Sequence, residues 1–539
     1  MPFGILEPKL AEGVRVPGTV HLYEALHGID ETENAAHLKR DGDIILVPQP
    51  SNSSNDPLNW SRKKKDLILA VLCLAGIMAS TASPLLASST IVLVLYLGKG
   101  FQPIALLTGW NLFAAAITSI FVTAISVKYG KRFLYVFASV ILIAGSAWGS
   151  AATSYRSLLG ARILQGVALA PFEALLNASI GDMYFVHERG IRLAIASLCV
   201  FGSSFLTPVI TGRLTATLGW HWMFLFLLIF SCVSGLLVFF FVPEHVYNRD
   251  KRFETDVLGE AVGQLATPSI DQDEKVTESN TLAQEVPESY LHSLWLFSGS
   301  KSSRPLHKIF LRPFALLLHP AVIWGCLTQG TLIAWTVMIG VVLAAIFMGP
   351  PLWYDEVNVG YMYAGAAVGS VVGFVFAGLL SDFLVKSLSK KNNNIYEPEF
   401  RILLVLPQMA FAIAGIWGFG ITANDMYTYS KFLPPVFFGM VTCAMILGAV
   451  ASSTYITDAH RDIQVEAFIV MLMFKNLFSF ALTERAYFWL LHLGVRKCFV
   501  IVGSVQIAIS VFTLLFWVIG KYDRHFTHKY NIIAILHLD

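Results

Sequence analysis

Four polar side chains interrupt one membrane-length apolar run that begins at Leu158: Arg162, Gln165, Glu173 and Asn177. An ionisable group at bilayer depth is costly, so it usually lines a cavity or pairs with another group. At about 100° per residue, Arg162 and Glu173 fall within roughly 20° of one helix face, about 16 Å apart. We therefore expect this face to line a water-filled path through a helix bundle. The alternative is that the two charges only form interhelical salt bridges.

A second apolar run carries Lys475 and Asn476 near its middle and Glu484 and Arg485 nearer its end. Lys475 facing Glu173 would give a charge-compensated central cavity, which is a hypothesis at this point. Glu484 and Arg485 are adjacent and point about 100° apart, so we expect them to contact different neighbours. Whether this second pair is structural or takes part in transport stays open.

Amide and aromatic side chains in other apolar runs could complete such a cavity: Asn111, Gln329, Trp335, Tyr361 and Tyr363. For each one alone, packing or an aromatic belt at the membrane interface is the alternative explanation. A broad aromatic cavity with few fixed polar groups suits bulky amphipathic cargo.

The composition indicates an integral membrane protein. The 539 residues are 55% hydrophobic and 14% charged, whereas soluble domains carry about 25% charge. The net charge of +2 gives no sign of a nucleic-acid partner. Six cysteines lie within apolar runs without ligand-like spacing, so we predict no disulfide and no metal site.

Apolar runs of about 20 residues predict an all-α integral membrane fold with twelve spans. The predicted spans are 66–88, 104–127, 133–152, 157–183, 190–213, 220–242, 317–347, 357–380, 401–421, 430–455, 465–491 and 496–520. They form two six-helix bundles, 66–242 and 317–520, an arrangement associated with rocking about a central site. The remaining segments are a tail at 1–65, a linker at 243–316 and a tail at 521–539. Both the first tail and the acidic, Ser/Thr-rich linker are predicted to be disordered.

Basic residues concentrate in alternate loops, which places both termini in the cytosol by the positive-inside rule. No cleaved signal peptide is evident, so the first span is expected to direct insertion. Within the second bundle, Gly365, Gly369 and Gly373 repeat every four residues, which predicts the close approach of a neighbouring helix.

Several sequence blocks carry a family resemblance, among them DPLNWSRKKK at 56–65, ARILQG at 161–166, DMYFVHERG at 182–190 and TYITDAHRDIQVEAF at 454–468. With these blocks the chain resembles the major facilitator superfamily, and within it the fungal twelve-span drug:proton antiporter-like branch, which includes relatives of polyamine carriers. The resemblance implies the major facilitator fold in the plasma membrane. It also implies a monomer that binds a small molecule and protons, without a cofactor.

The resemblance also carries roles for particular residues. The family's cytosolic gating motif corresponds to residues 123–132, where the matching positions are Lys128, Gly130, Lys131 and Arg132, and the second-half copy keeps Asp382. Val127 replaces the acid of the first copy. Arg162 matches a basic residue of the family that is linked to proton coupling. Glu173 lies in a stretch of this chain that is similar to the same stretch in related sequences. Because burial favours the protonated form of a carboxylate, Glu173 is the predicted proton or cation carrier.

The leading interpretation is therefore proton-coupled export of a hydrophobic small molecule such as a secondary metabolite, toxin or drug. The first alternative is proton-coupled uptake of an organic cation such as a polyamine, which would need several cavity acids, whereas Glu173 is the one firm candidate. A non-transporting membrane sensor is a remote alternative. The chain has no Walker-type GxxxxGK[ST], GxSxG or HExxH motif, so neither ATP-driven transport nor an enzyme is expected.

Overall fold

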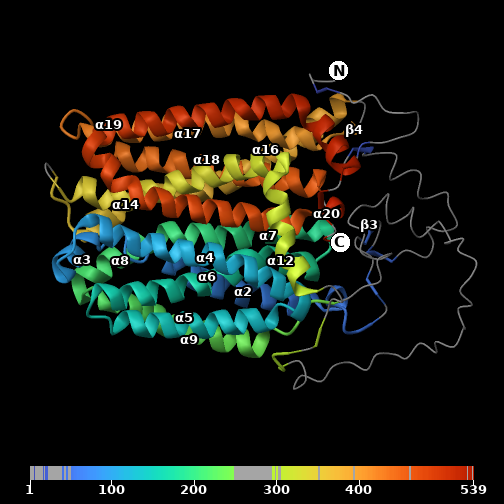
Figure 1. The fold of residues 1–539 in the computed structure, drawn as a ribbon, viewed down its shortest axis with the longest axis horizontal. Helices are drawn as coiled ribbons and strands as arrows, with labels where there is room; N and C mark the ends of the chain where they lie inside the picture. The colour runs from blue at the N-terminus through green and yellow to red at the C-terminus, as the bar shows by residue number, and fades with distance from the viewer. Residues whose placement is uncertain are drawn as a thin grey trace, which may run out of the picture.

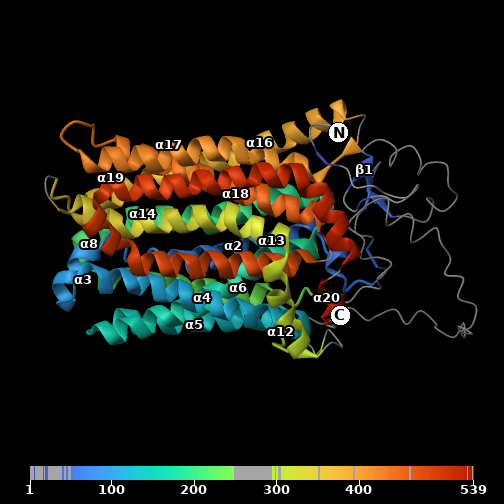
Figure 2. The same ribbon diagram turned by 45° about the horizontal axis from the view of Figure 1, so that its top comes forward.

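The computed structural model describes residues 53–247, 305–349, 352–392, 395–460, 463–530 and 532–536, together with short stretches near residues 5, 20, 40, 45 and 295. Long helices run side by side along one axis (Figure 1), and the turned view in Figure 2 shows the same alignment. This confirms the predicted all-α membrane fold.

The first bundle contains six spans. They are α2 (Arg62–Ala82), α4 (Phe101–Tyr129), α5 (Arg132–Ser150), α6 (Tyr155–Met183), a segment of three continuous helices α7 (Val186–Ser197), η4 (Leu198–Gly202) and α8 (Ser203–Leu218), and finally α9 (His221–Phe241). Their buried apolar residues form one core. A short helix, α3 (Thr90–Leu97), follows α2. The predicted first span, 66–88, is therefore too long at its end, because Ala82 closes α2.

The second bundle also contains six spans. They are α13, η7 and α14 (Pro320–Gly325, Cys326–Gly330, Thr331–Phe347), α15 with α16 (Glu356–Met362, Ala364–Lys391), η8 with α17 (Pro398–Leu404, Val405–Asn424), α18 (Leu433–Ala459) and both parts of α19 (Gln464–Lys529). Within α19, Gly494 has φ 73°, a value that glycine adopts without the penalty of a Cβ. Two helices meet there, so the described residues cross the bundle twelve times.

The small elements lie at one end of the bundle. Strand β1 (Val20–His21) pairs antiparallel with β4 (Ile395–Tyr396), and β2 (Arg40–Asp41) pairs with β3 (Ile44–Ile45). The helices η3 (Pro57–Asn59), α12 (Leu306–Ala315), η6 (Leu316–Leu318) and α20 (Ile532–Ile535) complete the described elements. Helix α12 runs across the long helices (Figure 1).

The predicted linker and tails correspond only in part to what the structure describes. Residues 248–293 of the linker and most of the tail at 1–65 lie outside the described residues. The end of the linker forms α12, whose Phe310 ring packs 5.2 Å from that of Phe121 on α4. The last helix continues beyond the predicted end at residue 520 to Lys529, and Lys521 and Arg524 form ion pairs there.

The repeated glycines of α16 provide the closest packing in the second bundle. A Cβ added to Gly365 would lie 2.0 Å from the Pro435 carbonyl oxygen, and one on Gly369 would lie 2.1 Å from that of Gly439. The backbones of α16 and α18 therefore touch, which confirms the prediction made from the four-residue spacing.

We predict that Gly369→Val separates α16 from α18, because its side chain meets a backbone oxygen that cannot move independently of its helix. Overpacking of this kind costs about 1–3 kcal/mol or more. Thermal unfolding of the purified protein should show a midpoint several degrees lower.

Gly378→Ala is the matched control in the same helix, because its Cβ would meet no atom within 4 Å. That variant should keep the unfolding midpoint of the parent. Equal midpoints for Gly369→Val and the parent would contradict the proposed packing role.

Candidate functional site

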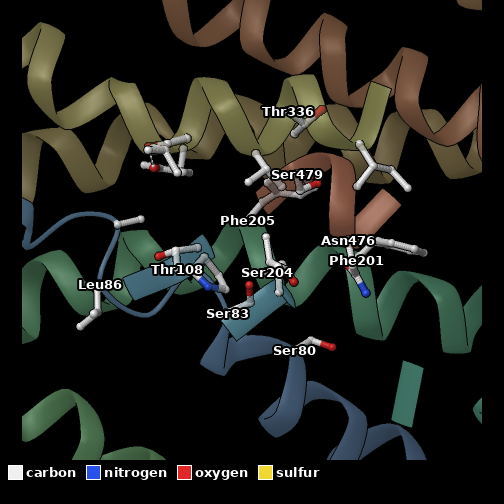
Figure 3. Close-up of a pocket in the computed structure, with 18 of the residues that line it drawn as sticks. Ser80, Ser83, Leu86, Thr108, Phe201, Ser204, Phe205, Thr336, Asn476 and Ser479 are labelled. Carbon is white, nitrogen blue, oxygen red and sulfur yellow. Dashed lines mark hydrogen bonds between the residues drawn. The ribbon is translucent and has the colours of Figure 1, made fainter. Parts of the chain in front are cut away.

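A cavity of about 140 Å³ lies between the two bundles, close to the middle of the long helices. A water molecule needs roughly 10–15 Å³ of such space, so the cavity has room for several waters or part of an organic molecule. The first bundle contributes lining residues from α2, α4, α6, η4 and α8, and the second contributes them from α14, α18 and α19. Figure 3 shows side chains of both bundles facing the same space.

Glu173 and Lys475 form an ion pair across this cavity. The Lys475 ammonium donates to Glu173 Oε1, and Asn476 Nδ2 donates to Glu173 Oε2 at 3.2 Å. The side chain of Glu173 is 11% exposed and that of Lys475 is 5% exposed. The ammonium also lies 5.4 Å from the centre of the Phe201 ring, a favourable cation–π arrangement. The pair therefore joins α6 of one bundle to α19 of the other.

The rest of the lining is apolar or carries hydroxyl groups. Among the lining residues that the structure describes, Glu173 is the only carboxylate and Lys475 the only cation. The hydroxyl groups come from Ser80, Ser83, Thr90, Thr108, Ser204, Thr336, Tyr363 and Ser479. Rings of Phe201, Phe205 and Phe438 also line the cavity. The site thus offers one neutralised charge pair, several weak hydrogen-bonding groups and a large apolar wall.

Arg162 lies outside the lining of this cavity and is fully buried. Its guanidinium donates to the carbonyl oxygens of Ala82 and Ser83, the latter at 2.6 Å, and to Gln165 Oε1 at 2.7 Å. These carbonyls belong to the last turn of α2, where the helix dipole favours a cation. Arg162 therefore holds the end of α2 and does not contact Glu173, although both lie on α6.

Of the eight residues predicted to form the substrate cavity, Tyr363, Lys475 and Asn476 line it. The other five lie outside the lining: Asn111, Gln165, Asn177, Gln329 and Trp335. Four of these form hydrogen bonds elsewhere. Asn111 donates to the Arg162 carbonyl, and Gln165 accepts from the Arg162 side chain. Gln329 accepts from Ser452, and Trp335 donates to Gln506. Asn177 and Tyr361 are exposed on the bundle surface. Four of the eight residues therefore form hydrogen bonds outside the cavity, whereas three line it.

The predicted gating motif forms a compact polar cluster at the end of α4. Lys131 Nζ pairs with Asp182 Oδ2 at 2.6 Å. The backbone N–H groups of Lys131 and Arg132 donate to the Glu244 carboxylate at 3.2 and 3.1 Å. Gly130 has φ 95°, and a Cβ there would lie 2.3 Å from Glu244. Asp182 and Glu244 thus supply acids near the position where Val127 replaces the acid of the family motif.

Four other residues singled out from the sequence make fewer contacts. Lys128 lies 5.8 Å from the Tyr129 ring centre, and Asp382 is exposed without an ion pair among the described residues. The expectation that Glu484 and Arg485 contact different neighbours is wrong, because Arg485 Nε lies 2.7 Å from Glu484 Oε2. Both side chains are partly exposed and long enough to bend toward each other.

Contacts between the bundles concentrate at the end of the cavity away from β4 and α20. There Gln102 Nε2 donates to the Thr483 carbonyl at 3.3 Å, which joins α4 to α19. A Cβ on Gly212 would lie 2.4 Å from the Glu356 carbonyl oxygen, so α8 and α15 also touch. At the opposite end the ion pairs Lys131–Asp182 and Arg401–Asp458 each stay within one bundle. The two bundles therefore touch at this end of the cavity through side chains and backbone.

The hydroxyl groups and Phe201 were not predicted from sequence. Serine, threonine and phenylalanine are common throughout membrane helices, so their type alone does not mark a cavity. Asp182 opens the sequence block DMYFVHERG at 182–190, but its contact with Lys131 and those of Glu244 with residues 131 and 132 depend on how the helix ends pack.

Comparison with known proteins agrees with this architecture. The family profile described as the Major Facilitator Superfamily matches residues 68–483. Protein HOL1 of Saccharomyces cerevisiae is 22% identical over 582 residues, covering 96% of this chain and 97% of HOL1. The multidrug transporter DTR1 of Candida glabrata is 24% identical over 409 residues, covering 74% of each chain.

Among solved structures, the proton:xylose symporter XylE is similar in fold, with a TM-score of 0.56 and 16% identity, over 85% of this chain and 97% of XylE. The profile match extends from the first span into the eleventh and includes both Glu173 and Lys475. With its twelve crossings and its central cavity between two bundles, the chain belongs to the major facilitator superfamily of multi-pass membrane transporters.

Proposed function

We propose that this transporter is a proton-coupled exporter of a hydrophobic small molecule in the plasma membrane, acting as a monomer with both termini in the cytosol. The observation that carries the proposal is the Glu173–Lys475 ion pair, which spans the two bundles inside a largely apolar cavity. Glu173 is the proposed proton carrier because it is the one carboxylate among the described lining residues.

In this mechanism the proton and Lys475 compete for the same carboxylate. An ionised Glu173 attracts the ammonium and holds α6 near α19, whereas protonation removes that attraction. Removing one partner of a buried ion pair typically costs 3–5 kcal/mol. About 5.5 kcal/mol moves a two-state equilibrium from 1:99 to 99:1. Protonation of Glu173 therefore changes the free-energy difference between two arrangements of the bundles by enough to shift their populations.

The walls of the cavity favour a hydrophobic cargo. Phe201, Phe205 and Phe438 offer apolar contact, and the hydroxyl groups offer adaptable hydrogen bonds. A polyamine carries several positive charges, but the single lining carboxylate already binds Lys475. The similarity to a relative named as a multidrug transporter supports the same choice.

Arg162 is proposed to act as a positioning residue for the cavity. Its hydrogen bond to the Ser83 carbonyl fixes the end of α2, from which Ser80 and Ser83 line the cavity. Its part in proton coupling is therefore indirect, through the placement of α2 beside the cavity.

Replacing Glu173 with Gln should abolish the dependence of transport on a pH gradient, because an amide cannot take up the proton. The protein should be reconstituted in proteoliposomes and assayed with amphipathic dyes such as rhodamine 6G. An imposed pH gradient should drive dye movement at least tenfold faster in proteoliposomes that contain the parent protein than in those that contain Glu173→Gln.

Glu484→Gln is the matched control, because Glu484 is exposed outside the cavity. It should keep the pH-driven rate. A Glu173→Gln variant with unchanged proton coupling would exclude Glu173 as the carrier.

Arg162→Lys should lower the transport rate more than Arg213→Lys, which alters an exposed arginine on α8. A lysine keeps the charge, but its single ammonium cannot reproduce the planar fork that contacts Ala82, Ser83 and Gln165. Loss of one such charged hydrogen bond costs about 1.5–3 kcal/mol. Rates should be compared at equal amounts of folded protein, and equal rates for the two variants would contradict the positioning role.

The choice of cargo is tested by uptake of radiolabelled spermidine in cells that lack or overproduce the transporter. The proposal predicts no change in spermidine uptake and at least twofold lower retention of amphipathic dyes in overproducing cells. Spermidine uptake that is lost on deletion and restored by the gene would overturn the exporter proposal in favour of cation import.

A further inference from the structure

Two histidines and one aspartate meet at the end of the second bundle next to β4 and α20, far from the cavity. His319 immediately precedes α13, His460 immediately follows α18, and Asp523 lies in the second part of α19. Each residue comes from a different membrane span, and the helices α13, α18 and α19 pack against one another. The cluster therefore connects the seventh, tenth and twelfth spans.

The three side chains present their ligand atoms to one another. One ligand atom from each residue lies within 4.8 Å of the other two. His319 is 4% exposed and Asp523 is 8% exposed. The atoms His319 Nδ1, His460 Nε2 and Asp523 Oδ2 are all buried without a hydrogen-bond partner among the described residues. Each unsatisfied buried polar atom costs about 1–3 kcal/mol, so three at one point form a place where a cation would be stabilised.

The charges around the cluster also favour a cation. Arg524 donates to Glu397 and Glu399 at 2.8 Å, and Lys521 pairs with Glu397 at 2.7 Å. Asp523 makes no ion pair among the described residues, so its carboxyl group is free to contact a cation. Neutral imidazole is the form in which histidine binds metals.

We propose that His319, His460 and Asp523 form a divalent-metal site in the second bundle, suited above all to Zn²⁺. Two imidazole nitrogens and a carboxylate oxygen are common zinc ligands, with bonds of about 2.0–2.2 Å. Those bonds place two ligands of a tetrahedral ion roughly 3.4 Å apart. Side-chain rotations that move each ligand atom by about 1 Å would therefore bring the three atoms to a common ion. A water molecule would be the fourth ligand.

The surrounding residues would support such an ion. The Tyr455 ring lies 6.2 Å from that of His460, and its buried hydroxyl has no partner among the described residues. Rings of Trp324 and Phe516 stack 5.2 Å apart beside Tyr455. The aromatic residues limit access of bulk water, and the tyrosine hydroxyl is a candidate to bind the fourth-ligand water. The ion would join three spans, two of which are also linked here by the hydrogen bond from Trp324 Nε1 to Thr513 Oγ1 at 3.2 Å.

The first test measures metal content in the full-length protein, purified in detergent through an affinity tag without histidines. After treatment with a chelator, the protein should be dialysed against buffer that contains about 10 µM Zn²⁺. Its zinc content should then be measured by elemental mass spectrometry. The expected result is about one zinc per chain and a higher thermal-unfolding midpoint than for the chelated protein. Zinc content near zero with identical midpoints would overturn the proposal.

The second test assigns the ligands. His460→Gln and Asp523→Asn should each lower zinc affinity by roughly 100-fold or more, a loss at least as large as second-shell changes produce. His492→Gln is the matched control, because His492 is an exposed histidine outside the cluster that contacts the carbonyl and the ring of Phe488. Binding that is unchanged in both ligand variants would place the ion elsewhere and overturn the assignment.

A third measurement remains informative even if a variant fails to fold. Cobalt(II) bound by the unaltered protein should show the intense visible absorption of a four-coordinate ion, reversed by added Zn²⁺. An octahedral spectrum, or one that also appears with denatured protein, would contradict a built site. None of these measurements depends on transport, so they stand or fall separately from the proposed export.

Discussion

The low polarity of a bundle interior makes an unpaired charge expensive, and this constraint explains where the charged residues of the transporter lie. Arg162 is surrounded by carbonyl oxygens and an amide, whereas Glu173 meets Lys475. Although both charges lie on α6, they serve different purposes. Arg162 holds the end of α2 within its own bundle. Glu173 contacts the other bundle through Lys475, and in the proposed mechanism protonation breaks this ion pair.

The two ends of the bundle differ in the kind of contact that joins their helices. At the end near β4, charged groups form pairs inside each bundle, such as Lys131 with Asp182 and Arg401 with Asp458. At the other end, glycine allows α8 and α15 to touch between bundles. Ion pairs within a bundle do not resist relative movement of the bundles, but contacts between bundles do. The direct contacts between the bundles described above therefore lie at the end away from β4, with Glu173 and Lys475 as a further link at the centre. Near β4, the linker helix α12 contacts both bundles, through Phe121 of α4 and through the Arg312–Glu466 ion pair with α19.

Much of the architecture could be predicted from the sequence because hydrophobic length and glycine spacing are local properties. The twelve spans and the contact of Gly369 with α18 follow from such patterns. The cavity was harder to predict, since a polar residue in an apolar run satisfies its hydrogen bonds equally well between helices. Trp335 does this with Gln506, and Asn111 does it with the Arg162 carbonyl. Glu173 and Lys475, as charges of opposite sign at similar depth, were the strongest local indication.

Contacts between residues distant in sequence were not predictable in the same way. His319, His460 and Asp523 show no local metal-binding motif, and the spacing of the cysteines predicts no metal site. Glu244 reaches the turn at Gly130 only because α5 and α9 pack side by side. In each case, the packing of helix ends creates the site.

In the proposed mechanism, Glu173 binds a proton in place of its ion pair with Lys475. Infrared difference spectra of the reconstituted transporter, recorded between neutral and acidic pH, would test this directly. The account predicts a carbonyl stretching band from a newly protonated carboxylic acid that is present in the parent and in Glu484→Gln but missing in Glu173→Gln. Identical bands in all three proteins would show that the proton binds elsewhere and would contradict the account.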